Sequence, residues 1–154
     1  MGNLQIPTDM HLVMGLAPVA DAFSGTVYSD IIEVAGQGMG FVIFKGAGAT
    51  GTSTVTVEAC STIAAAATAA VAFWYKRIGT TDSGWTAATS AGFTTTAAAS
   101  DIYHIAVAAD VIGVTGYAYV RLKMVESVDD PVLGGILAYV YGGRFTPQPA
   151  SLID

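Results

Sequence analysis

The stretch from Phe41 to Cys60 constrains the fold most, because it joins an apolar run to a run of strict alternation. From residue 54 to residue 59, threonine or glutamate alternates with valine or alanine, and this two-residue period places the two kinds on opposite faces of a strand. Between the runs lies Gly46-x-Gly48-x-x-Gly51, the spelling of a dinucleotide-binding fingerprint. The stretch is therefore either a β-hairpin with a glycine-rich loop or a phosphate-binding turn.

The residues after the glycines favour the hairpin. In a dinucleotide-binding fold the glycines open a helix, whose N-terminus holds the pyrophosphate. Here Gly51 is followed by β-branched residues in strand alternation, which disfavour a helix. No acidic residue that could bind a ribose lies between Glu58 and Asp82. We therefore predict a hairpin over residues 41–60 and no bound cofactor.

Short alternating or β-branched runs recur along the chain, separated by turn signals. We predict strands over 26–34, 41–45, 52–60, 71–78, 85–88, 102–107, 117–127 and 132–141. Residues 63–70 are expected to form a loop or one helical turn, and residues 108–112 a brief helical connection closed by Gly113. About eight short strands without a long helix indicate an all-β fold, and we expect an antiparallel, jelly-roll-like β-sandwich.

The ends of the chain differ from its middle. Residues 1–22 contain Pro7 and Pro18 and show no sustained period, so we expect an extended N-terminal arm. Residues 23–145 form the expected sandwich domain, and residues 146–154 an extended tail. The apolar arm must lie either on its own domain or on a neighbouring subunit, and the sequence leaves both open. The candidate interface residues in the two ends are Ile6, Leu12, Val13, Met14, Leu16, Phe145 and Leu152.

Charge is scarce in this sequence. Charged residues make up 12% of the chain and hydrophobic ones 53%, so we expect other subunits to cover part of its surface. The net charge of −6 argues against a nucleic-acid partner, which requires a basic stripe. A single cysteine excludes an internal disulfide. The longest apolar run, residues 63–75, is too short to span a bilayer, so we expect no membrane partner.

Catalytic and metal-binding patterns are weak. Cys60, His104 and Asp101 would form a nucleophilic triad only with a geometry that the sequence does not indicate, and we expect His104 to be an ordinary strand residue facing away from its neighbours. The adjacent carboxylates Asp129 and Asp130 precede a proline and fit a turn better than a calcium loop. We therefore expect no enzyme activity and no metal site.

Aromatic residues offer an alternative. Stacking on sugar rings would suit exposed aromatic side chains, although core and subunit-interface packing explains the same residues. The candidates for such a platform are Trp74, Tyr75, Trp85, Tyr117 and Tyr119.

Several segments together resemble small virion structural proteins of tailed bacteriophages, in particular capsid decoration or cement proteins. The segments are Phe23-x-Gly25, Ser29-Asp30-Ile31-Ile32, the stretch from Phe41 to Cys60, Phe73-x-Tyr75-x-Arg77, Gly116-Tyr117-x-Tyr119-Val120-Arg121-Leu122-Lys123, Val132-Leu133-Gly134-Gly135-Ile136-Leu137, Tyr139 and Arg144-Phe145.

The resemblance implies a β-sandwich that is made in the host cytoplasm, binds the major capsid protein on the outside of the phage head and reinforces the virion. It also implies a homo-oligomer, with a trimer as one form, and it transfers no catalytic residue. The alternative function is a carbohydrate- or receptor-binding module of a phage tail or fibre.

Overall fold

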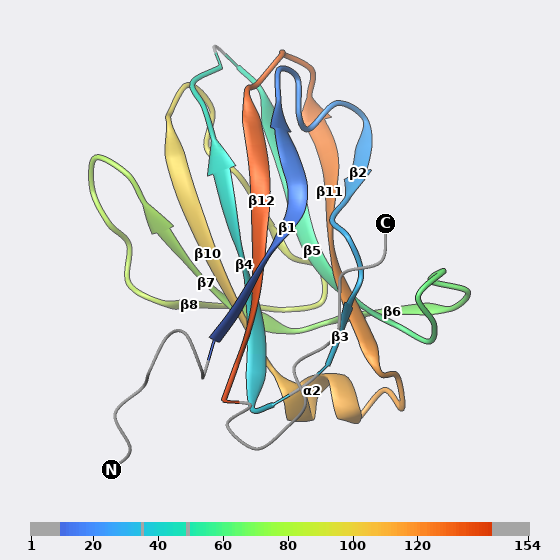
Figure 1. The fold of residues 1–154 in the computed structure, drawn as a ribbon. Helices are drawn as coiled ribbons and strands as arrows, with labels where there is room; N and C mark the ends of the chain where they lie inside the picture. The colour runs from blue at the N-terminus through green and yellow to red at the C-terminus, as the bar shows by residue number, and fades with distance from the viewer. Residues whose placement is uncertain (1–9, 35, 49, 143–154) are drawn as a thin grey trace.

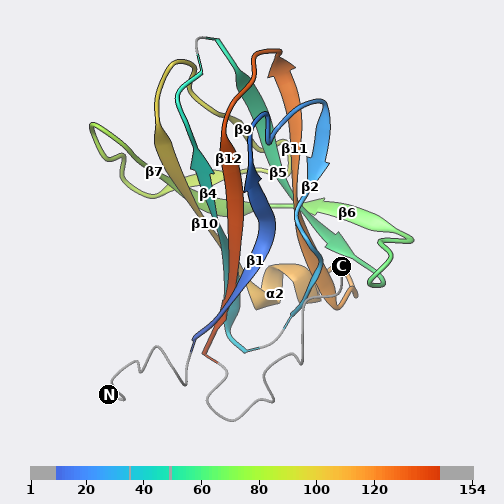
Figure 2. The same ribbon diagram turned by 45° about the horizontal axis from the view of Figure 1, so that its top comes forward.

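The computed structural model describes residues 10–34, 36–48 and 50–142, and these form two antiparallel sheets packed face to face (Figures 1 and 2). Sheet A has the order β1 (Met10–Val19), β12 (Gly134–Tyr141), β4 (Gly38–Lys45), β10 (Asp101–Ala108), β7 (Phe73–Ile78) and β8 (Thr86–Ala88). Sheet B has the order β2 (Thr26–Tyr28), β11 (Tyr119–Val128), β5 (Thr52–Cys60) and β6 (Thr68–Val71), with β3 (Ile32–Glu33) paired to β11 and β9 (Phe93–Thr94) paired to β5. The expected antiparallel β-sandwich is confirmed.

The core lies between the sheets and is built from alternate residues of each strand. In the middle of sheet A, Phe41 and Ile43 of β4 are fully buried, and in sheet B Val55 and Val57 of β5 are equally buried. The expected short helix, α2 (Ala109–Gly113), follows β10 and buries Ile112 at one end of the sandwich (Figure 1). No helix in the described ranges is long and apolar enough to cross a bilayer.

The predicted hairpin over residues 41–60 is wrong. β4 pairs with β10 and β12 in sheet A, whereas β5 pairs with β11 and β6 in sheet B, so the glycine-rich loop crosses from one sheet to the other. The glycines have a steric reason: a Cβ at Gly46 would lie 2.9 Å from the Leu133 carbonyl oxygen, and one at Gly51 would lie 2.7 Å from that of Asp130. The loop packs too closely against the 130–133 segment for larger residues.

The N-terminal arm is only partly as expected. Residues 10–19, which the prediction placed in the arm, form β1 and pair along β12 at the edge of sheet A (Figure 1). Of the two possibilities left open for the arm, packing on its own domain therefore holds for this part. The register shifts between Met14 and Leu16 and again between Leu16 and Val19, and in the second interval Pro18 has no N–H to donate to the ladder. Residues 1–9 and the tail 146–154 lie outside the described residues.

Two predicted strands are divided in the structure. The predicted strand over 71–78 contains a sheet change, because β6 ends in sheet B at Val71 and β7 begins in sheet A at Phe73. The predicted strand over 26–34 consists of β2 and β3, both paired with β11. Two-residue alternation continues through such changes, so the sequence shows the strands but not the sheet to which each belongs.

Candidate functional site

The outer face of sheet A, which points away from the core, is apolar across its strands. The register places the outward residues in rows that cross the sheet. One row runs from Met14 on β1 through Leu137, Val42 and His104 to Lys76 on β7. Lys76 is the one charged residue that the alternation places on this face within the six strands, and it pairs with Asp82 at 3.4 Å. A sheet with one face on a core usually has a polar second face, so this face is unusual.

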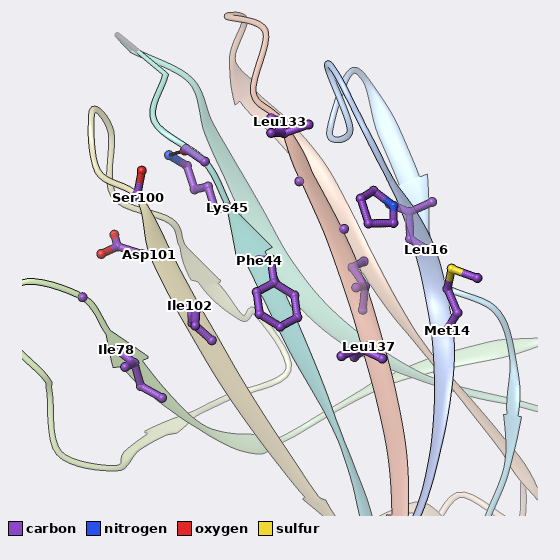
Figure 3. Close-up of a pocket in the computed structure, with 16 residues that line it drawn as sticks. Met14, Leu16, Phe44, Lys45, Ile78, Ser100, Asp101, Ile102, Leu133 and Leu137 are labelled. Atoms are coloured by element: carbon purple, nitrogen blue, oxygen red, sulfur yellow. Dashed lines mark hydrogen bonds between the residues drawn. The ribbon is translucent and has the colours of Figure 1, made fainter.

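A groove of about 840 Å³ lies on this face, at the end where β12 begins (Figure 3). Five neighbouring strands each contribute an apolar side chain to it, namely Met14, Leu137, Phe44, Ile102 and Ile78. Met14 is 56% exposed and Phe44 41% exposed. Burying such side chains against another surface is worth about 25 cal/mol per Å² of apolar area, so the groove favours an apolar partner.

Two tyrosines of β12 lie flat over the strand beside them. Tyr139 and Tyr141 extend across Gly40 and Gly38 of β4, and a Cβ at either glycine would overlap the tyrosine ring that covers it. The rings are tilted neighbours with centroids 6.1 Å apart. The glycines thus give the rings room to lie down, and the sheet face remains flat there instead of carrying projecting aromatic side chains.

His104 forms an uncharged polar contact in the middle of this face. A ring nitrogen, Nε2, lies 2.5 Å from the Tyr139 hydroxyl, and the Trp85 ring lies 4.9 Å from the imidazole between centroids. Burial, aided by nearby Lys76, lowers the pKa of His104, and burial raises the pKa of Tyr139 to about 12. Both groups are therefore neutral near pH 7, which suits an apolar face.

The residues of the conceivable triad do not come together. His104 points outward from sheet A, on the face opposite the buried Tyr103 and Ile105, as the sequence predicted. Cys60 ends β5 in sheet B, where burial raises the pKa of its thiol. Asp101 Oδ2 accepts instead from Arg77 Nε at 2.9 Å. The described residues thus offer no activated cysteine at this histidine.

The carboxylate of Asp101, which the sequence analysis considered only as a member of a triad, is buried near the rim of the sandwich. The Asp101 side chain is 1% exposed, and its Oδ1 atom has no hydrogen-bond partner among the described residues. Lys45, its neighbour in register on β4, donates from Nζ to the Ala99 carbonyl at 3.2 Å. Burial lowers the pKa of Lys45, and the charge of Asp101 opposes that shift. These groups close the end of the core.

The outer face of sheet B is polar and satisfied internally. Glu58 on β5 accepts from Arg121 Nη2 at 2.7 Å and pairs with Lys123 Nζ at 3.3 Å. The Arg121 guanidinium lies 3.8 Å from the centre of the Tyr28 ring, a cation–π contact. The same face carries the threonines of β5, such as Thr54, which contacts the Ser127 hydroxyl at 3.0 Å. Its polar groups largely have partners within the chain.

The candidate interface residues divide between the two sides of sheet A. Leu12, 54% exposed, and Met14 lie on the outer face. Val13 points to the other side and packs against the core, so it is not available as an outer contact. Leu16 packs partly on the core and also lines the groove. Ile6, Phe145 and Leu152 lie outside the described residues.

The five aromatic candidates do not form one platform. Trp74, on β7, lies on the outer face of sheet A, and Trp85, just before β8, stands beside His104 on the same face. Tyr75 faces the core and stacks on Phe93 at 4.0 Å between ring centroids. Tyr117 also packs against the core, and Tyr119 belongs to sheet B. Two tryptophans therefore remain on one surface.

The acidic pair before Pro131 serves a turn. Asp130 Oδ2 accepts from the backbone N–H of Thr50 at 2.8 Å, which ties the glycine-rich loop to the segment before β12. The described residues contain no group of three or more side chains suited to holding a metal ion.

Comparison with known protein families, curated proteins and solved structures finds no match for this chain.

Proposed function

We propose that this chain is a capsid decoration protein, which binds the major capsid protein on the outer surface of a tailed-phage head and stabilises the virion. The observation that carries the proposal is the outer face of sheet A, which is apolar across its strands and uncovered by any described residue. The resemblance of the sequence to such proteins agrees with this surface. The reaction chemistry of an enzyme plays no part in the proposed function.

Cementing a shell means burying apolar area across neighbouring subunits and adding main-chain pairing at strand edges. β1 offers both. It is the edge strand of sheet A and pairs with β12 on one side, and its outer face presents Leu12 and Met14. We therefore place the contact with the shell at the β1 end of this face. The bulges at Gly15 and Pro18 would limit pairing to the first half of the strand.

The test is reconstitution on purified phage heads that lack the chain. Cosedimentation should show saturable binding of the purified protein, and bound heads should release their DNA at a higher temperature than bare heads. Leu12→Lys should abolish both effects, because a lysine at that position would have to be desolvated in the contact.

The matched control is Val125→Lys. Val125 is an exposed strand valine, 37% exposed, but it lies on the outer face of sheet B. This variant should bind like the wild type. If the folded wild-type protein fails to bind any heads, or if Val125→Lys abolishes binding while Leu12→Lys does not, the proposal is wrong.

A carbohydrate-binding module of a tail or fibre is the second candidate, and one observation favours it. Trp85 stands beside His104, with Trp74 on the same face, so exposed rings lie near groups able to form hydrogen bonds. A glycan array would decide: this function requires a signal that Trp85→Ala removes, and an array without signal would eliminate it.

A further inference from the structure

We propose that His104 makes the attachment of this chain to the shell sensitive to acid, so that the attachment weakens as the pH falls below neutral. The inference rests on the proposed function, because it concerns the same outer face of sheet A. It goes beyond that function in naming a residue that regulates the attachment. Two features of the face carry it, namely the central position of His104 and the lack of a free carboxylate around it.

His104 lies inside the area that a shell contact would cover. In the row that crosses the sheet from Met14, it follows Leu137 and Val42, so it lies three strand spacings, about 14 Å, from the β1 edge. An interface of standard size buries about 800 Å² per partner, which corresponds to a patch about 30 Å across. A contact that begins at β1 therefore reaches His104 and removes water from its ring.

The neutral form of His104 suits this place. Its Nε2 atom lies 2.5 Å from the Tyr139 hydroxyl, and the Trp85 ring packs beside the imidazole. A neutral imidazole nitrogen can accept the hydrogen of that hydroxyl, whereas a protonated ring can only donate, so the hydroxyl would have to turn. Burial raises the pKa of Tyr139 to about 12, so the tyrosine cannot balance a charge on the histidine. Protonation of His104 therefore disturbs this contact.

The ionisable groups around His104 do not offer it a counter-charge. Those on the outer face come from the two sides of β10, namely Lys76 on β7 with its partner Asp82, and Tyr139 with Tyr141 on β12. The other neighbour in register, on β4, is the uncharged Val42. The charged residues of β4 and β10 themselves, Lys45 and Asp101, are buried on the core side near the rim.

A charge on His104 would therefore be unpaired beneath the shell. Lys76 lies beside His104 in register and already engages Asp82 at 3.4 Å, so protonation would place two cations together with one carboxylate. Burying an unpaired charge is strongly unfavourable, whereas burying a neutral, hydrogen-bonded imidazole is not. The attached state thus prefers the neutral histidine.

The direction of the pH dependence follows from this preference. Burial, together with the charge of Lys76, already lowers the pKa of His104 in the free chain, and covering the ring lowers this pKa further. Attachment then releases a proton wherever the free chain is protonated. The affinity is complete above the ordinary histidine pKa of about 6.5 and falls, by up to about tenfold per pH unit, below the pKa of the free chain.

The test is cosedimentation of the full chain with purified heads that lack it, at about pH 7.5 and at about pH 5.0. The wild-type affinity should fall by about fivefold or more between these values. His104→Gln can still form a hydrogen bond with Tyr139 but cannot ionise, so it should bind at both values with little change. His11→Gln is the matched control: His11 pairs with the buried Val140 and so faces away from the outer face, and this variant should retain the wild-type pH dependence.

Circular dichroism at both pH values shows which proteins remain folded. If His104→Gln does not fold, calorimetry of the wild type at about pH 6 in two buffers of different ionisation enthalpy replaces it, and should show protons released on attachment. An equal wild-type affinity at both pH values, a fall that folded His104→Gln shares, or attachment without proton release overturns the inference and leaves the proposed function standing. Heads that bind no wild-type protein at about pH 7.5 overturn the proposed function and this inference with it.

Discussion

The two sheets of this sandwich share one core but differ on their outer faces. Sheet B carries Glu58 between Arg121 and Lys123, with the ring of Tyr28 against the guanidinium. Sheet A carries the groove around Phe44 and a single paired lysine. The strands of both sheets contribute alternate residues to the core, so folding alone does not require this difference.

The difference indicates that the faces have separate roles. Polar groups on sheet B satisfy one another, so that face is stable against water without a partner. The apolar face of sheet A gains free energy only when something covers it. Substitutions on sheet B should therefore change stability and leave assembly intact. Charged substitutions of the exposed apolar side chains on sheet A, such as Leu12 and Phe44, should chiefly change assembly.

The largest expected effect on stability is at Glu58. Glu58→Ala leaves Arg121 and Lys123 near each other without their shared carboxylate, and breaking such a largely buried pair should cost about 3 kcal/mol of unfolding free energy. Asp82→Ala removes the exposed partner of Lys76 and should cost less than about 1 kcal/mol. Urea titrations measure both. If Glu58→Ala lost no more unfolding free energy than Asp82→Ala, the contacts of Glu58 with Arg121 and Lys123 would not stabilise the fold as described.

Gly40→Ala should have the next largest effect. A Cβ at this position would overlap the Ile105 carbonyl oxygen and the Tyr139 hydroxyl, so the β10 backbone and the flat ring must both shift, at a cost of about 2 kcal/mol. Gly84→Ala is the control, because nothing lies near its Cβ position, and it should be close to neutral. Thermal melting of the two variants compares them. A neutral Gly40→Ala would contradict the packing described for Tyr139.

Tyr139→Phe removes one hydroxyl from the apolar face and keeps the ring. The lost contact with His104 should lower the free energy of unfolding by about 1 kcal/mol. Self-association should remain, because the surface stays apolar. Denaturation and sedimentation of the same sample measure both properties. A loss of assembly without a loss of stability would mean that this hydroxyl serves assembly and not the stability of the fold.

The smallest effect is a dependence on pH through His104. Because burial lowers the pKa of this histidine in the folded chain, the unfolded chain takes up the proton first as the pH falls. The contribution of His104 is therefore constant above the unfolded pKa of about 6.5 and becomes increasingly unfavourable below it. His104→Gln should lose less stability than the wild type between about pH 7.5 and about pH 5.5. Melting curves would contradict this if the wild type and His104→Gln lost the same amount of stability over this pH range.

Local alternation was sufficient to predict the class of fold. The valines of β5 and alternate residues of β11, namely Val120, Leu122 and Met124, face the core as their two-residue period indicates. The short helix after β10 was also expected. Pairing between strands was harder to predict. Nothing in the sequence of the loop at 46–51 distinguishes a hairpin from a crossing between sheets, because the distinction depends on the contacts of its glycines with the 130–133 segment.

The apolar face left a signal in the sequence that strand prediction alone did not use. Strands covered on one side alternate, as β5 does, whereas strands apolar on both sides read as unbroken apolar runs. Phe41-Val42-Ile43-Phe44 on β4 and Ile136-Leu137-Ala138-Tyr139-Val140 on β12 are such runs, and they lie side by side in sheet A. The groove itself arises from five strands in register, which no local pattern shows.

An electron-microscopy map of the assembled particle containing this chain tests the central claim most directly. The outer face of sheet A, with Leu12, Phe44 and Trp74, should be covered by protein density from the shell or from another copy. The outer face of sheet B, with Arg121, should be open to solvent. A map in which sheet A faces solvent and sheet B is covered would contradict the account.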